Sequence, residues 1–227
     1  QHNLLLHLEQ ELLQLRRHEK DFLLRHQMDY YHRFTARSER FAQDLVRLSP
    51  LLEDYALPVE QTGVLAQSMD DYQRLFQKVV TLQSQIGLTR QSGLQGKLTE
   101  IETSMERDAF FDYGKPAYQQ KVILQLATRN YLLTHEGFYR QTVAQALEQL
   151  RQSAAISNNK AAGVLIDHYA SNFNQLSEAI FSMGLSHNEG LRGEFRHQAH
   201  DVEELLVVDH LVPDVVPVAG LLEGLEP

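Results

Sequence analysis

The chain has 227 residues, of which 43% are hydrophobic and 22% are charged, so it can bury a core and is not a disordered polymer. Its formal net charge of −9 argues against a nucleic-acid-binding surface, because contacts with phosphates need clustered Lys and Arg. The absence of Cys excludes disulfides and Cys-based metal sites.

The first predicted element is one long helix over residues 3–48, which contain no Pro or Gly and are rich in helix-forming residues. Its apolar stripe reads Leu24, Met28, Tyr31, Phe34, Phe41, Leu45 and Leu48. Carried toward the N-terminus, the same stripe passes through Arg17 and Lys20, which predicts two cations at inward positions. Burying a cation requires an anion, which either the protein or a ligand must supply.

Five further helices are expected along the chain, with breaks where Pro, Gly and polar turn residues gather. Their predicted ranges are 62–85, 93–112, a second long helix at 117–153, 161–183 and 189–207. The stretch 208–227 contains three prolines and two glycines, so we expect a linker or a tail outside the domain.

An internal repeat connects these elements. At an offset of 97, Tyr72 and Phe76 correspond to Tyr169 and Phe173, and LTRQSGLQGKL (88–98) corresponds to LSHNEGLRGEF (185–195). At an offset of 109, residues 20–24 correspond to residues 129–133. The sequence therefore predicts a duplicated helical unit.

Two long helices and four short ones predict an all-α fold of two stacked antiparallel four-helix bundles. In this arrangement each long helix passes through both bundles. One module would combine residues 1–22 with 130–207, and the other would hold residues 23–129.

Two stretches resemble the signatures of a known family, the helical bimodular sensor domain. They are LRRHEKDFLLR (15–25) and GLSHNEGLRGEFRHQAHDVE (184–203), and the resemblance covers about residues 10–205. This family forms the extracytoplasmic ligand-binding region of bacterial methyl-accepting chemotaxis receptors and some sensor histidine kinases. The resemblance implies the stacked-bundle fold, a homodimer and a periplasmic location at the inner membrane. It also implies two flanking membrane spans that this chain lacks, so we expect an excised piece of a receptor.

The candidate ligand-binding residues are cations that this topology brings together, with polar neighbours from the 161–183 helix. They are Arg16, Arg17, Lys20, Arg129, Arg140, Tyr169, Asn172 and Arg192. Arginine matches a carboxylate with two parallel hydrogen bonds, so several of them in a gap between helices suit a dicarboxylate or tricarboxylate. The alternative is that Arg17 and Arg140 pair with Glu19, Glu136 or Glu194 inside the protein. Arg25, His26 and Tyr30 are weaker candidates in the other module.

Metal and catalytic chemistry find little support in the sequence. Only Glu194 and His197 have the spacing of a di-iron carboxylate motif, and His197, His200 and Asp201 are more typical of a solvated helix face. No triad, phosphate loop or zinc-protease motif is present, so we expect no enzyme, no cofactor and no metal site.

The functional expectation is therefore a sensor domain that binds small organic acids, such as citric-acid-cycle intermediates or acetate, and signals by helix displacement. Family members of this kind bind such ligands. The alternative is the sensor domain of a histidine kinase that reads a periplasmic binding protein rather than a free metabolite. A purely structural bundle is the third possibility.

Overall fold

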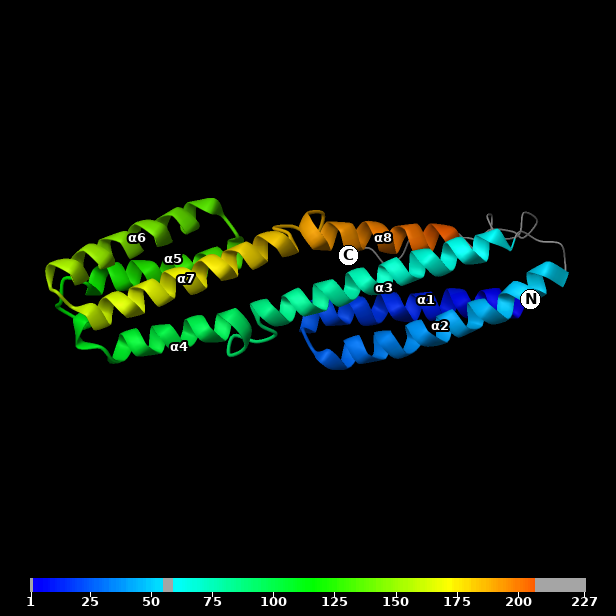
Figure 1. Cartoon of the computed structure of the whole chain (residues 1–227), viewed down its shortest axis with the longest axis horizontal. Coiled ribbons are helices and arrows are strands. Elements are labelled where there is room, and N and C mark those ends of the chain that lie inside the picture. Colours follow the sequence, from blue (N-terminus) through cyan, green and yellow to red (C-terminus); the bar gives the residue numbers. More distant parts are fainter. Residues whose placement is uncertain (1, 55–58, 207–227) are drawn as a thin grey trace. The chain divides into compact units, whose positions relative to one another are not determined.

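The computed structural model describes residues 2–54 and 59–206, and this part of the chain is all-α, with one short 3-10 helix (Figure 1). The helices are α1 (His2–Arg25), α2 (Met28–Asp54), α3 (Glu60–Ile86), α4 (Gly93–Arg107), η1 (Ala109–Phe111), α5 (Tyr118–Thr134), α6 (Gly137–Ile156), α7 (Lys160–Met183) and α8 (Gly190–Leu206). The all-α prediction is confirmed. The prediction of six helices is not, because both expected long helices are interrupted.

Two compact units divide the chain. Unit 1 consists of Gln1–Thr81 and Ser186–Pro227, and therefore contains α1, α2, most of α3 and α8. Unit 2 consists of Leu82–Leu185 and contains α4 to α7. These boundaries differ from the modules expected from the sequence, which were 1–22 with 130–207 and 23–129. The predicted tail at 208–227 lies outside the described residues.

The expected helix over residues 3–48 ends at Arg25, and the chain turns back at His26 (Figure 1). His26 adopts the left-handed conformation, with φ of 51°, and its amide donates to the Phe22 carbonyl at 2.7 Å. This is the geometry of a helix C-terminal cap, a position that Gly usually occupies. The helices α1 and α2 consequently form an antiparallel hairpin within unit 1.

A change in the phase of the apolar pattern explains this break. Leu8, Leu15 and Phe22 are buried in α1, and Phe34 and Phe41 are buried in α2. Each set repeats every seven residues, but Phe22 and Phe34 are twelve residues apart, so one straight helix cannot bury both stripes on one face. Extending the α2 stripe through the turn was therefore wrong.

The second expected long helix, 117–153, is interrupted in the same way. His135 closes α5 with φ of 58°, and α6 starts at Gly137. Tyr131 and Val143, the buried residues on either side of the turn, are again twelve residues apart. The other predicted helices match α3, α4, α7 and α8 in place, although α2 continues through Pro50 instead of ending there.

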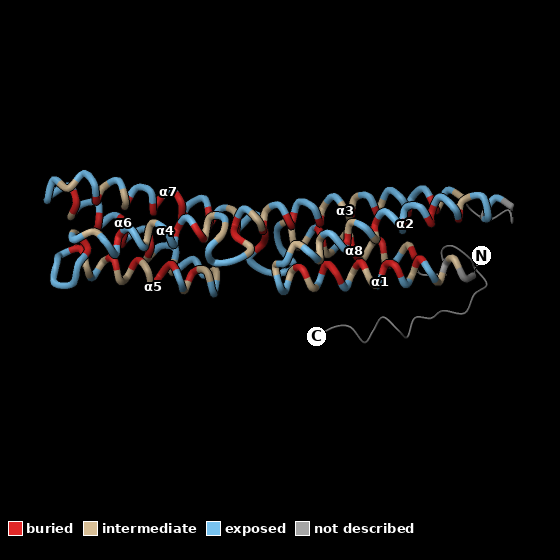
Figure 2. Tube along the Cα trace, turned by 90° about the horizontal axis from the view of Figure 1, so that it is seen from below, coloured by how far each residue is buried: buried red, intermediate tan, exposed pale blue. Residues whose placement is uncertain are grey.

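Aromatic packing forms the centre of unit 1. The rings of Phe34 and Phe76 lie 4.4 Å apart between centroids, and Phe195 of α8 stacks on Tyr72 and Phe76 of α3 at 5.3 Å from each. Such ring pairs add about 0.5–1.5 kcal/mol beyond the area that they bury. Figure 2 shows that buried positions recur along the helices and alternate with exposed ones. These contacts hold α8 against the first three helices.

Within the described residues the repeat extends over the eight α-helices, with α1–α4 equivalent to α5–α8. The two turns before α4 and α8 are also equivalent. Gly96 and Gly193 both pack so closely that an added Cβ would overlap the carbonyl oxygen of Gln91 or Asn188, respectively. Each unit therefore combines three helices of one repeat with the fourth helix of the other repeat.

Candidate functional site

A cavity of about 690 Å³ opens between α1 and α8 in unit 1. We call it the basic pocket; it is lined by Arg16, Glu19, Lys20, Leu23, Leu24, His187, Arg192, Phe195, Arg196 and His200. Four of these side chains carry a fixed positive charge and one is a carboxylate. The volume is within the range of small-molecule sites.

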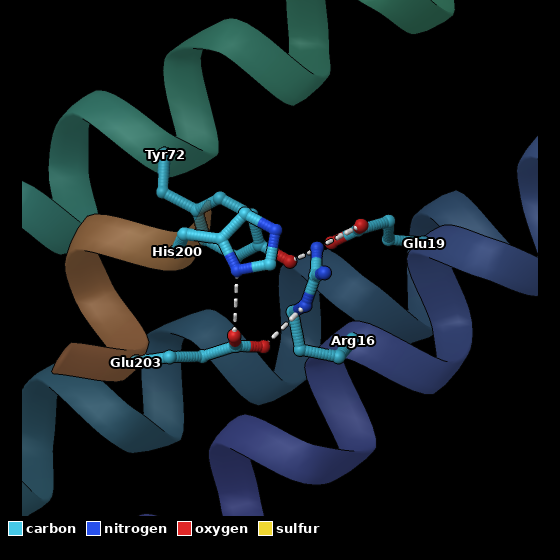
Figure 3. A network of polar contacts seen from close by, with 5 residues as sticks. All are labelled: Arg16, Glu19, Tyr72, His200 and Glu203. Carbon is cyan, nitrogen blue, oxygen red and sulfur yellow. Dashed lines mark hydrogen bonds and ion pairs between the residues drawn. The ribbon is translucent and has the colours of Figure 1, made fainter. Parts of the chain in front are cut away.

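Three of the lining residues, Arg16, Glu19 and His200, belong to a polar network around Arg16 (Figure 3). The Arg16 guanidinium lies between two carboxylates: it pairs with Glu19 one turn away and donates from Nε to Glu203 of α8 at 2.7 Å. The Tyr72 hydroxyl donates to the other oxygen of Glu19, and His200 lies 3.2 Å from Glu203. Three helices thus meet at one charged side chain.

Burial sets the electrostatics of this network. Burial raises the pKa of Glu19, and the pairing with Arg16 and the hydrogen bond from Tyr72 offset only part of that effect. Burial lowers the pKa of Arg16, but Glu19, Tyr72 and Glu203 together outweigh it, so the pKa is raised. Arg16 is therefore a fixed cation that the protein itself neutralises.

Arg192 is in a different situation. Its Nε atom is buried and has no hydrogen-bond partner within the described part of the chain. Burial lowers the pKa of Arg192, and no described carboxylate offsets this. Burying a guanidinium without an anion costs free energy, so a hydrogen-bond acceptor at this side chain would be stabilising.

The pocket can therefore accept an anion. Lys20 and Arg196 line the same cavity as Arg192, and Leu23 and Phe195 supply apolar surface. A planar guanidinium can hold one carboxylate through two hydrogen bonds, and an ammonium can hold a second carboxylate as a point charge.

The structure brings together three of the predicted site residues: Arg16, Lys20 and Arg192 all line the basic pocket. Arg17 is exposed and does not line it, so its predicted inward position is wrong. Lys20 lines the pocket but is also exposed, so it is not part of the core. Both residues were placed inward because the apolar stripe of α2 was extended through the turn at His26, whereas α1 buries a different stripe.

The other predicted residues belong to unit 2 and do not converge on one site. Arg129 lines a separate pocket there, and Arg140 is exposed. Tyr169 is buried, and its hydroxyl lies 2.7 Å from the Thr128 hydroxyl and donates to Glu102 at 3.1 Å. Asn172 is buried with its Oδ1 unpaired in the described structure. Ligand binding by all these residues stays a prediction.

The alternative to ligand binding, in which Arg17 and Arg140 pair with Glu19, Glu136 or Glu194, finds no such ion pair among the described residues. Glu19 pairs with Arg16 instead. Arg25 lies over the Tyr30 ring at 5.9 Å. Burial, and then the charge of Arg192, lowers the pKa of His26. These three weaker candidates lie at the hairpin turn and line none of the pockets described above.

Sequence reasoning missed His187, Arg196 and His200 in the pocket. A signal for the last two was available, because Arg192, Arg196 and His200 recur every four residues and therefore share one face of α8. Glu194 and His197 are exposed, and the described residues contain no group of three metal-ligating side chains placed to hold an ion.

Comparison of the chain with protein-family models, with curated proteins and with solved structures finds no match. Among the helices of residues 2–54 and 59–206, none has the length and apolarity needed to cross a lipid bilayer. The family resemblance of residues 15–25 and 184–203 therefore remains an inference from those residues.

Proposed function

We propose that this chain is the extracytoplasmic ligand-binding domain of a transmembrane chemoreceptor, and that it recognises small organic acids in the basic pocket. The observation that carries the proposal is Arg192, whose guanidinium is half-buried in the pocket wall without an acceptor for Nε in the described structure. A ligand carboxylate would provide that acceptor and would offset the cost of burying the charge.

The charge pattern favours a dicarboxylate or a tricarboxylate over a neutral ligand. One carboxylate would lie on Arg192, and a second would lie near Lys20. The apolar walls formed by Leu23 and Phe195 suit a short carbon chain between them. Acetate would satisfy only one of the two cations and should bind more weakly.

Such a ligand would connect α1 to α8, because its two ends would contact cations on different helices. A ligand shifts a conformational equilibrium only through its different affinities for the two states. Binding would favour the arrangement in which Lys20 and Arg192 are closest, and helix shifts of about 1–2 Å are typical of such signals. In the receptor, both helices would pass this shift toward the membrane.

Isothermal titration of the purified chain with malate, succinate, citrate and acetate tests the proposal. We expect saturable heat from at least one polycarboxylate and at least tenfold weaker binding after Arg192→Gln, because a charge-assisted hydrogen bond contributes about 1.5–3 kcal/mol. Arg17→Gln is the matched control, since it removes the same charge from an exposed position outside the pocket. Far-UV circular dichroism establishes that both variants are folded.

The absence of heat from all four acids would overturn this proposal and favour a sensor that reads a periplasmic binding protein. Equal loss of binding in Arg17→Gln and Arg192→Gln would indicate a general effect of charge instead of a site. Loss of stability in Arg192→Gln with unchanged binding would assign a structural role to Arg192.

A further inference from the structure

Unit 2 contains a second pocket at the position that the repeat makes equivalent to the basic pocket. This unit 2 pocket has a volume of about 360 Å³ and lies between α4 and α5. The offset of 109 relates Arg16, Glu19 and Lys20 to Gln125, Thr128 and Arg129, and the offset of 97 relates Arg192 and Phe195 to Gln95 and Leu98. All five residues of unit 2 line its pocket. The duplication thus preserved the cavity and changed its charges.

The carboxylate of the site has moved to another helix. In unit 1, Tyr72 donates to Glu19 of α1. In unit 2, the equivalent Tyr169 lies 2.7 Å from Thr128 and donates to Glu102 of α4, at a position where α8 has Ala199. Both units therefore keep a pair of a buried tyrosine and a carboxylate, but in unit 2 the carboxylate also lines the pocket from the opposite wall.

The carboxylate of unit 2 has lost its internal cation. Glu19 pairs with Arg16, whereas the equivalent of Arg16 is Gln125, and its amide donates to Glu106 at 3.2 Å. Among the described residues no cation forms an ion pair with Glu102, although Arg129 is close enough to act through space. Burial accordingly raises the pKa of Glu102, and the Tyr169 hydrogen bond and the Arg129 charge offset only part of this effect. A cation placed beside Glu102 would therefore stabilise its ionised carboxylate.

Two cations line the same cavity. Arg129 lies on α5 and Arg90 lies in the turn before α4, and neither forms an ion pair within the described part of the chain. A dicarboxylate would place its second charge against Glu102, and a simple amine would meet both arginines. A ligand with one group of each sign satisfies both sides of the pocket.

We propose that the unit 2 pocket binds a small zwitterion, an α-amino acid with an apolar side chain. Its ammonium group would lie on Glu102, its carboxylate on Arg129, and its side chain against Leu98 and Leu132. The inference goes beyond the proposed function, because it concerns another site and another class of ligand.

Calorimetric titration of the whole chain with L-alanine, L-valine and L-leucine tests the proposal. Isovalerate and isobutylamine are matched probes, since each keeps the carbon skeleton of valine and lacks one charged group. We expect saturable heat from at least one amino acid and binding of both valine analogues at least tenfold weaker than that of valine. No heat from any of the three amino acids, or isovalerate binding as tightly as valine, would overturn the proposal.

Substitutions locate the site. Glu102→Gln removes the charge while its amide oxygen can still accept from Tyr169, so the fold should persist and amino-acid binding should weaken at least tenfold. Glu100→Gln on the same helix is the control, because Glu100 is exposed and does not line the pocket. Arg129→Gln removes the anion contact from an exposed position, and it should weaken amino-acid binding even if Glu102→Gln perturbs folding.

The two proposals fail separately. Arg192→Gln should weaken binding of dicarboxylates at least tenfold and leave amino-acid binding unchanged. Glu102→Gln should weaken amino-acid binding at least tenfold and leave dicarboxylate binding unchanged. Loss of amino-acid binding in Arg192→Gln would place that ligand in the basic pocket and overturn the inference. Unchanged amino-acid binding in both Glu102→Gln and Arg129→Gln would do the same.

Discussion

Replacing Arg16 with glutamine removes the only cation that pairs with Glu19 in the described structure. The side chains of Arg16 and Glu19 are 12% and 4% exposed, so the values for buried ion pairs apply, not those for surface pairs. Leaving one member of a buried pair without its partner costs about 3–5 kcal/mol. Glutamine occupies the equivalent position 125 in the other repeat, so its shape suits this environment.

Urea unfolding followed by circular dichroism at pH 7 measures this loss in the free energy of unfolding. The control is Arg17→Gln, an exposed change on the same helix turn, for which we expect a change within about 0.5 kcal/mol. The pH dependence provides a second check. Burial already raises the pKa of Glu19 above its ordinary value of 4.5, and removing Arg16 raises it further. The cost should therefore shrink as pH falls and the carboxyl group becomes neutral in both proteins.

A compensating change tests the assignment to this pair. The double variant Arg16→Gln with Glu19→Thr reproduces the residues found at 125 and 128 in unit 2, where Thr128 contacts Tyr169. We expect it to lose less stability than the two single variants together, with a coupling of about 0.5–3 kcal/mol. If Arg16→Gln is as stable as Arg17→Gln at pH 7, the Arg16–Glu19 pair does not stabilise the fold. The same conclusion follows if the losses of stability in Arg16→Gln and Glu19→Thr simply add in the double variant.

Three further predictions concern stability. Because burial raises the folded-state pKa of Glu102 above its ordinary 4.5, the stability linked to its protonated form is present below pH 4.5 and is lost as pH rises through the folded-state pKa. In urea titrations, the free energy of unfolding of Glu102→Gln should therefore rise relative to that of the wild type as the pH increases from 4 to 7. A difference that stays constant with pH would contradict this. Gly63→Ala should stabilise α3 by about 0.5–1 kcal/mol, since nothing lies within 4 Å of the added methyl group. Gly96→Ala should destabilise the protein, because the added methyl group would overlap the Gln91 carbonyl oxygen. Thermal melts that rank the two variants in the opposite order would contradict the close packing at Gly96. Phe22→Ala should lower the free energy of unfolding by about 3–5 kcal/mol, because Phe22 is fully buried. Leu24→Ala, at a site 79% exposed, should change it by less than about 0.5 kcal/mol. Equal effects of the two substitutions would contradict the hairpin of α1 and α2.

Much of the fold follows from local sequence patterns. Helical periodicity predicted the all-α class, and the Gly-containing turns at 87 and 184 marked the ends of α3 and α7. The repeat was visible in Tyr72 and Tyr169, which occupy equivalent buried positions. The turn at His26 was not predicted, because no Gly or Pro marks it and the burial of both Phe22 and Phe34 is known only from the structure. His tolerates the left-handed conformation better than most residues, so the usual break signals were absent.

The site was only partly predictable. The cations at 16, 20 and 192 could be selected because Arg and Lys at helical spacing indicate an anion site, but the sequence did not tell Arg16 from Arg192. Arg16 is neutralised by Glu19 and by Glu203, and Glu203 is 187 residues away along the chain. No described carboxylate offsets the burial of Arg192. Such pairings depend on which helices meet, and periodicity contains no information about them.

The amino-acid sequence by itself determined the all-α class, the places of α3, α4, α7 and α8, and the duplication of the helical unit, because propensity and periodicity are local properties of the chain. Only the tertiary structure decided that each repeat gives its fourth helix to the other unit, so that α8 completes the basic pocket beside α1. The physical reason is that a helix packs on whichever apolar surface buries its stripe most completely, and that surface can belong to residues far away in the sequence.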